Sequence, residues 1–115
     1  MLAHGALLRK NFFSAEQMAA IVKDFRNANL PSEEVAMMSF AQKVITQASQ
    51  VSEGDYDDLR ACGFSDEEIL DVVLASTARS FFSKTLDTLN AKPDEAYLEL
   101  EPELVQLFTA RRPFP

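Results

Sequence analysis

The sequence predicts an all-α fold, a compact helical bundle, on three observations. Apolar residues recur at helical spacing behind serines that are suited to cap helices. No run of residues alternates between apolar and polar side chains between tight turns. Only three glycines are present, and hairpin turns of the Asn-Gly type are missing. The length of 115 residues suits one domain, which we expect to span residues 1–115.

The first predicted helix covers residues 14–28. The Ser14 hydroxyl is placed to accept from the backbone N–H of Gln17, whose side chain can reach back to form a capping box. Apolar residues then follow at helical spacing, namely Met18, Ile21, Val22 and Phe25. We expect the helix to end at the segment that contains Asn27, Asn29 and Pro31.

Two further helices are predicted over residues 32–50 and 52–62. Ser32 is the expected cap of the longer one, whose apolar residues predict burial on more than one side: Val35, Met37, Met38, Phe40, Ala41, Val44 and Ile45. The shorter one ends before Gly63, which fits the left-handed position after a helix. Phe64 is then expected to fold back onto the last turn, as in a Schellman motif.

The strongest helical signal covers residues 65–90. Ser65 and Glu68 form a second predicted capping box. The apolar residues point in nearly all directions around the helix axis: Ile69, Leu70, Val72, Val73, Leu74, Phe81, Phe82, Leu86 and Leu89. A helix that is apolar all round is a core helix or an oligomer-interface helix. We expect this helix to be central to the bundle.

Pro93 ends helical order and begins an apolar tail over residues 93–115. Pro102 suits the first position of a short helix, whereas Tyr97–Glu101 suits an extended segment. Because the tail is rich in leucine and phenylalanine, we expect it to pack on this chain or on a neighbour.

Composition excludes several classes of function. Eighteen acidic residues against eleven basic ones give a net charge of −7, so a nucleic-acid binder is not expected. One cysteine excludes an internal disulfide framework, an internal dithiol and a multi-cysteine zinc site, and no metal or cofactor is predicted. Residues 1–10 lack the features of a secretory signal, and no run approaches the roughly 20 apolar residues of a membrane span. A cytoplasmic location is therefore expected.

His4 and Cys62 are the only histidine and cysteine. His4 suits a proton carrier near neutral pH, and its alternative is an exposed residue at a frayed N-terminus. Cys62 lies near a predicted helix C-terminus among acidic residues, whereas a reactive thiolate needs a helix N-terminus or a nearby cation. We therefore expect a protonated, half-buried structural cysteine.

Other candidate side chains have structural interpretations. The acidic residues Glu53, Asp55, Asp57 and Asp58 do not meet the calcium-loop pattern, so a solvated helix face is predicted. Two cations suit an anionic substrate or a carboxylate partner: Arg79 and Lys84. Core packing is favoured over an apolar pocket for Phe12, Phe13, Phe81 and Phe82. Surface charges are predicted at Arg111 and Arg112.

Four segments carry a family resemblance that spans nearly the whole chain: LAHGALLRKNFF, AMMSFAQKV, LRACGFSDEEILDVVLASTARSFFSKTLDTL and PDEAYLELEP. Together they resemble the peroxidase-related, alkylhydroperoxidase-like branch of the carboxymuconolactone decarboxylase-like superfamily. The resemblance implies the oligomeric helical bundle of that superfamily and small hydroperoxides as the substrates of the full-length relatives, which act in antioxidant defence.

The chemistry that the resemblance implies rests on a C-x-x-C-x-x-x-H-G motif. A thiolate attacks a peroxide oxygen and becomes a sulfenic acid, the second cysteine forms a disulfide with it, and the histidine relays protons. His4 and Gly5 match the end of the motif, so both motif cysteines would lie before Met1. The chain thus resembles the C-terminal part of such a protein, with the relay His4 and no nucleophile.

Three functions follow as expectations. The first is a member of the thiol peroxidase family that lacks peroxidase activity in this chain, because the catalytic dithiol is absent. The second is a decarboxylase-like enzyme, in which Arg79 or Lys84 holds a carboxylate and His4 moves a proton. The third is a non-catalytic oligomeric module. A homo-oligomer is expected in each case, because apolar surface that the family's first helices normally cover must be buried elsewhere.

Overall fold

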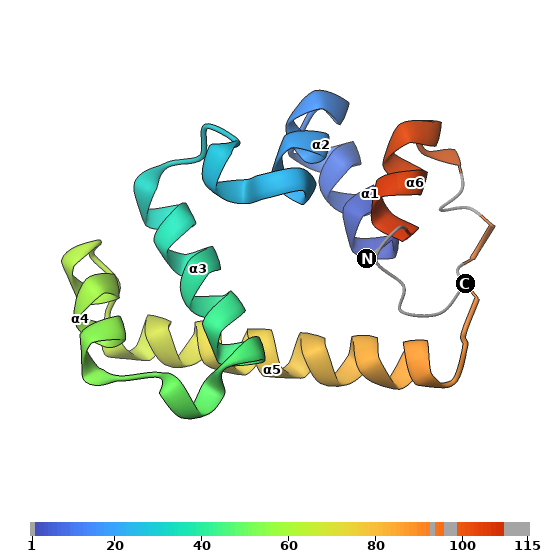
Figure 1. The fold of residues 1–115 in the computed structure, drawn as a ribbon. Helices are drawn as coiled ribbons and strands as arrows, with labels where there is room; N and C mark the ends of the chain where they lie inside the picture. Colours follow the sequence, from blue (N-terminus) through green and yellow to red (C-terminus); the bar gives the residue numbers. More distant parts are fainter. Residues whose placement is uncertain (1, 93, 96–98, 110–115) are drawn as a thin grey trace. The chain divides into compact units, whose positions relative to one another are not determined.

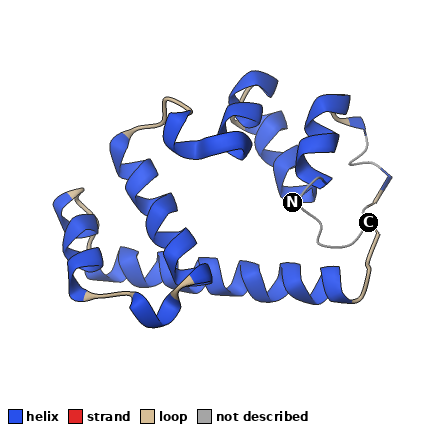
Figure 2. Cartoon of the chain, in the orientation of Figure 1, coloured by secondary structure: helices blue, strands red, loops and turns tan. Residues whose placement is uncertain are grey.

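The computed structural model of this chain describes residues 2–92, 94–95 and 99–109, and of residues 2–5 it describes the backbone alone. Every regular element in this part of the chain is helical, and none of its residues forms a strand (Figures 1 and 2). The predicted all-α class is therefore confirmed. The elements are α1 (Leu2–Asn11), α2 (Ala15–Asp24), η1 (Phe25–Asn27), α3 (Ser32–Thr46), η2 (Ala48–Gln50), α4 (Glu53–Ala61), α5 (Asp66–Thr88) and α6 (Pro102–Thr109).

The chain forms two compact units. The first unit joins the two ends of the sequence, Met1–Asn29 and Leu86–Pro115, and the second unit is the intervening segment Leu30–Thr85. Each unit has a cluster of buried apolar side chains of its own. The expectation of a single domain over residues 1–115 stays a prediction.

The core of the first unit holds the C-terminal tail against α2. Met18 of α2 and Leu104 and Phe108 of α6 are its buried side chains. The Arg9 guanidinium of α1 donates to the Glu101 carboxylate from Nε at 3.0 Å and from Nη2 at 2.6 Å, just before α6 begins. The predicted packing of the tail on its own chain is thus confirmed for residues 99–109, and α6 begins at Pro102 as expected. Of the stretch Tyr97–Glu101, Tyr97 and Leu98 lie outside the described residues.

The core of the second unit joins α3, α4 and the start of α5. Its buried side chains are Phe40, Val44, Leu59 and Ile69. Half-buried apolar groups pack around them, among them Tyr56, whose ring meets that of Phe40 edge-on at 5.9 Å. In α3 burial is narrower than predicted, since Ile45, expected on the buried stripe, is exposed.

Side-chain caps begin α2 and α5 where the sequence predicts them. The Ser14–Gln17 and Ser65–Glu68 boxes are both formed, with hydrogen bonds of 2.8–3.2 Å. The predicted cap at Ser32 is wrong. Pro31 occupies the N-cap position in an extended conformation, and its carbonyl accepts from the next turn, so Ser32 is already helical.

The turn after α4 follows the predicted Schellman motif. Gly63 has φ +97°, in the left-handed region that glycine adopts at little cost. The Phe64 N–H bonds the Leu59 carbonyl at 3.1 Å, and the Gly63 N–H bonds that of Arg60 at 3.0 Å. This turn aims Phe64 back onto the core of the second unit.

The prediction that α5 is a core helix is wrong. Ile69 is its only buried residue among those described, although the helix extends over 23 residues. The buried core that α5 shares with α3 and α4 takes in only its first turns, through Ile69, Val72 and Val73. The alternative, an oligomer-interface helix, stays a prediction.

The core of the first unit predicts the effect of a matched pair of substitutions. Leu104 is 1% exposed and Leu7 is 57% exposed, and both belong to this unit. Leu104→Ala should lower the free energy of unfolding in urea by about 2–5 kcal/mol, because it leaves a cavity. Leu7→Ala should change it by less than about 0.5 kcal/mol. Equal effects of the two substitutions would show that the tail is not buried as described.

Candidate functional site

His4 lies within helix α1, and its side chain lies outside the described residues, as do Arg111 and Arg112. The proton-relay role of His4 therefore stays a prediction. The same holds for the decarboxylase-like arrangement, because His4 belongs to the first unit, whereas Arg79 and Lys84 belong to the second.

Cys62 is the C-cap of α4 and is exposed to solvent. Its backbone N–H still bonds the carbonyls of Asp58 and Leu59, so the thiol lies at the helix end where the dipole is negative. Peroxide-reducing thiolates need the opposite helix end or a free cation. The expectation of a half-buried cysteine is wrong, because the turn at Gly63 brings Phe64, and not Cys62, onto the core.

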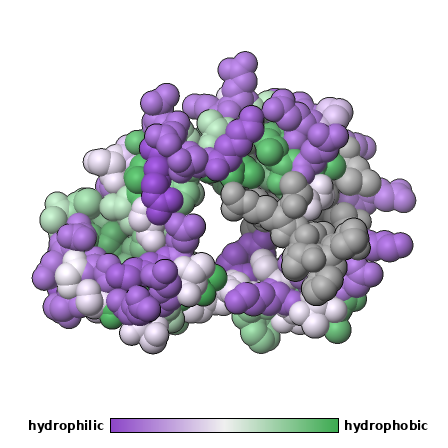
Figure 3. Space-filling model, viewed as in Figure 1, coloured by the Kyte–Doolittle hydropathy of each residue, from purple (hydrophilic) through white to green (hydrophobic). Residues whose placement is uncertain are grey.

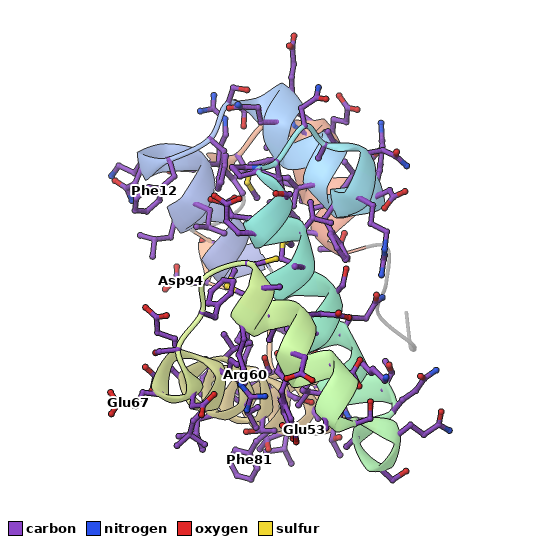
Figure 4. All side chains as sticks on the ribbon, turned by 90° about the vertical axis from the view of Figure 1, so that its left-hand side faces the viewer. Phe12, Glu53, Arg60, Glu67, Phe81 and Asp94 are labelled. Atoms are coloured by element: carbon purple, nitrogen blue, oxygen red, sulfur yellow. The ribbon has the colours of Figure 1, made fainter. Side chains whose placement is uncertain are left out.

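The cation nearest in sequence to Cys62 is held by three carboxylates. Arg60 Nη1 donates to Glu53 and to Asp57, and Nε donates to Asp66, each at 2.8 Å. Figure 4 shows Arg60 and Glu53 together at this edge of the second unit. The carboxylates of Glu53, Asp66 and Asp57, in decreasing order of effect, raise the pKa of Arg60 above its ordinary value. The Arg60 guanidinium therefore links α4 to the first turn of α5 through these hydrogen bonds.

The acidic run of α4 thus serves ion pairs rather than a metal. Asp55 accepts from the Lys43 ammonium of α3 at 2.7 and 2.9 Å, and from the Ser52 backbone N–H at 2.8 Å. These bonds, that of Lys43 foremost, lower the pKa of the Asp55 carboxyl below its ordinary 3.8. Within the described residues, no three histidine, cysteine or carboxylate side chains come close enough to hold a metal ion.

The sequence reasoning missed both ion-paired centres. The signals were present, since Asp57 lies three residues before Arg60 on the same helix, and Asp55 stands at the third helical position after Ser52. The sequence alone could not show that α3 and α5 pack beside α4. This packing brings Lys43 of α3 to Asp55, and Asp66 of α5 to Arg60.

The four singled-out phenylalanines are divided between core and surface. Phe13 packs against the core of the first unit, as predicted. For the other three the prediction of core packing is wrong: Phe12, Phe81 and Phe82 are exposed. Figure 4 shows Phe12 and Phe81 pointing away from their helices. Phe81 and Phe82 lie beyond the part of α5 that α3 and α4 cover.

The exposed apolar residues of α5 form one stripe. We call Leu70, Leu74, Ala78, Phe81 and Phe82 the α5 stripe; all five are exposed, and their spacing places them along one side of the helix. Apolar atoms are visible at the lower edge of Figure 3, where α5 runs in Figure 1. The opposite side of the same turns carries serines that are half-buried, namely Ser76, Ser80 and Ser83. The second half of α5 therefore directs its apolar side chains outward.

Comparison with models of known protein families, with curated protein sequences and with solved structures found no match to the chain. No described helix is both long and apolar enough to cross a lipid bilayer.

The ion pair of Asp55 predicts a pH-dependent contribution to stability. The folded-state pKa is lowered, so the stabilisation is present above the unfolded value near 3.8 and is lost as the pH falls through the folded value. Asp55→Asn keeps an oxygen for the Ser52 N–H but removes the charge that faces Lys43. We expect it to lower stability to urea at pH 6, and we expect the loss to shrink at an acidic pH as Asp55 becomes protonated in the folded state.

Asp58→Asn is the matched control, because Asp58 is exposed on the same helix, and the described contacts give its side chain no partner. It should leave stability unchanged at both pH values. An Asp55→Asn effect that persists undiminished at the acidic pH would show that the loss is not electrostatic.

Proposed function

We propose that this chain is a non-catalytic, self-associating module built on an alkylhydroperoxidase-like scaffold. The family resemblance of the sequence supplies the scaffold, and the all-α architecture agrees with it. The observation that carries the self-association is the α5 stripe, whose four large side chains, Leu70, Leu74, Phe81 and Phe82, are exposed. Exposed apolar patches of this kind mark interaction surfaces in proteins.

The position of the single thiol supports the absence of peroxidase catalysis. Reduction of a peroxide by a dithiol needs a nucleophilic thiolate and a second cysteine that forms the disulfide. The chain has one cysteine, and Cys62 lies at the negative end of the α4 dipole. The guanidinium of Arg60 is already bonded to three carboxylates, so it is poorly placed to stabilise a thiolate.

His4 does not by itself supply catalysis in this proposal. It matches the histidine of C-x-x-C-x-x-x-H-G, whose role in that motif is to relay protons for a thiol, and the thiol of this chain, Cys62, is not at a motif position. The decarboxylase-like alternative requires His4 to meet Arg79 or Lys84, and no described contact favours it over the proposal.

An assay with an alkyl hydroperoxide and dithiothreitol tests the proposal. The full chain should consume peroxide no faster than an equal concentration of N-acetylcysteine, because its exposed thiol lies at the C-terminal end of α4 and not at a helix N-terminus. Cys62→Ser should abolish this background, and His4→Ala should leave it unchanged. Turnover well above the free-thiol rate that depends on Cys62 or His4 would overturn the non-catalytic assignment.

A further inference from the structure

We infer that two copies of this chain pair antiparallel along the α5 stripe, about a two-fold axis that passes near Ala78. This inference rests on the self-association in the proposed function and names its surface and its geometry. It commits to a second copy of the chain as the partner.

The first argument is the amount of apolar surface. Phe81 and Phe82 are 75% and 52% exposed, so they leave about 250 Å² open if an aromatic side chain presents about 200 Å². Leu70 and Leu74 add to the same stripe. A stable interface buries about 800 Å² on each partner around a more apolar centre. The α5 stripe is of the right size to be that centre.

The second argument is the order of side-chain sizes along the helix. Two large residues, Leu70 and Leu74, come first, the small Ala75 and Ala78 follow, and the large Phe81 and Phe82 come last. A large–small–large order is the same from either end, which is what a two-fold axis across the helix requires. Around Ala78, the pairing sets Leu74 against Phe82 of the second copy.

The small residues at the centre allow the two helices to approach. Ala75 and Ala78 are both exposed, and no bulky group projects from their positions. With Ala78 on the axis, Phe81 of one copy lies opposite Ala75 of the other, so a large side chain meets a small one. Packing of this kind fills the interface without voids.

The third argument is charge, and it selects the direction. The first turns of α5 carry only acidic charge, at Asp66, Glu67, Glu68 and Asp71, whereas its later turns carry Arg79, Lys84 and, in the last turn, Asp87. A parallel pair in register would bring two acidic ends together, which is repulsive. An antiparallel pair about Ala78 sets Asp71 of each copy opposite Thr85 of the other, next to Lys84.

Sedimentation of the full chain with a matched pair of variants tests the surface. Phe81 and Phe12 are 75% and 72% exposed on different helices, so Phe81→Ser and Phe12→Ser remove equally exposed rings without touching a core. We expect a dimer whose dissociation constant rises about tenfold or more with Phe81→Ser and is unchanged with Phe12→Ser. Leu74→Ser should repeat the Phe81→Ser result.

Single cysteines test the direction. In a Cys62→Ser background, which removes the exposed native thiol, Ala78→Cys should give a disulfide-linked dimer on mild oxidation, because only residues near the axis come within about 7 Å of their own copies. Leu70→Cys should not, although a parallel pair would link both.

The outcomes separate the inference from the proposed function. A dimer that Phe81→Ser and Leu74→Ser leave intact, or one that links through Leu70→Cys, overturns the inference and leaves self-association standing. A chain that sediments as a monomer at tens of micromolar overturns both, and means that something other than a second copy covers the stripe.

Discussion

The main constraint on this structure is the limited burial of α5, because the core of the second unit buries only Ile69 among its described residues. The described residues provide seven buried apolar side chains in two small clusters, and ten large apolar side chains remain exposed. Small cores leave a narrow margin of stability over conformational entropy. The 23-residue α5 is anchored at Ile69, and its large apolar side chains Leu70, Leu74, Phe81 and Phe82 are exposed. Burial of these side chains against a further apolar surface would be favourable.

Local interactions fix the elements that surround this helix. The Schellman turn at Gly63 sets the chain's direction between α4 and α5, and Arg60 fastens the same junction by bonds to Asp66 and to two carboxylates of α4. Single exposed ion pairs contribute little to the free energy of folding. A guanidinium that bonds three carboxylates nevertheless fixes the orientation of the helix ends that carry them. In consequence the start of α5 is held firmly, and its later turns are left to project their apolar side.

The features that could be predicted from the sequence are those that depend on a few adjacent residues. The capping boxes at Ser14 and Ser65, the left-handed Gly63 and the helix start at Pro102 each need only local geometry. Burial could not be predicted in this way, because it depends on which helices meet. The periodicity of α5 is compatible with a core helix and with an interface helix, and the burial of Ile69 alone among its described residues argues against the core helix. Of the candidate site, the sequence supplied His4 and Cys62 but neither the exposure of the thiol nor the ion pairs that occupy Arg60 and Asp55.

Amide hydrogen exchange at two protein concentrations tests most directly whether the exposed side of α5 is an association surface. Exchange of the α5 amides over residues 74–85 should be slow in the concentrated sample and should accelerate on about 100-fold dilution, because dissociation removes the contacts that oppose opening of this helix. Residues 15–24 of α2, whose Met18 is buried against α6 within one copy, should exchange at one rate throughout. The two concentrations must lie above and below the dissociation constant of the dimer. Identical exchange rates of residues 74–85 at both would contradict the proposal that α5 is an association surface.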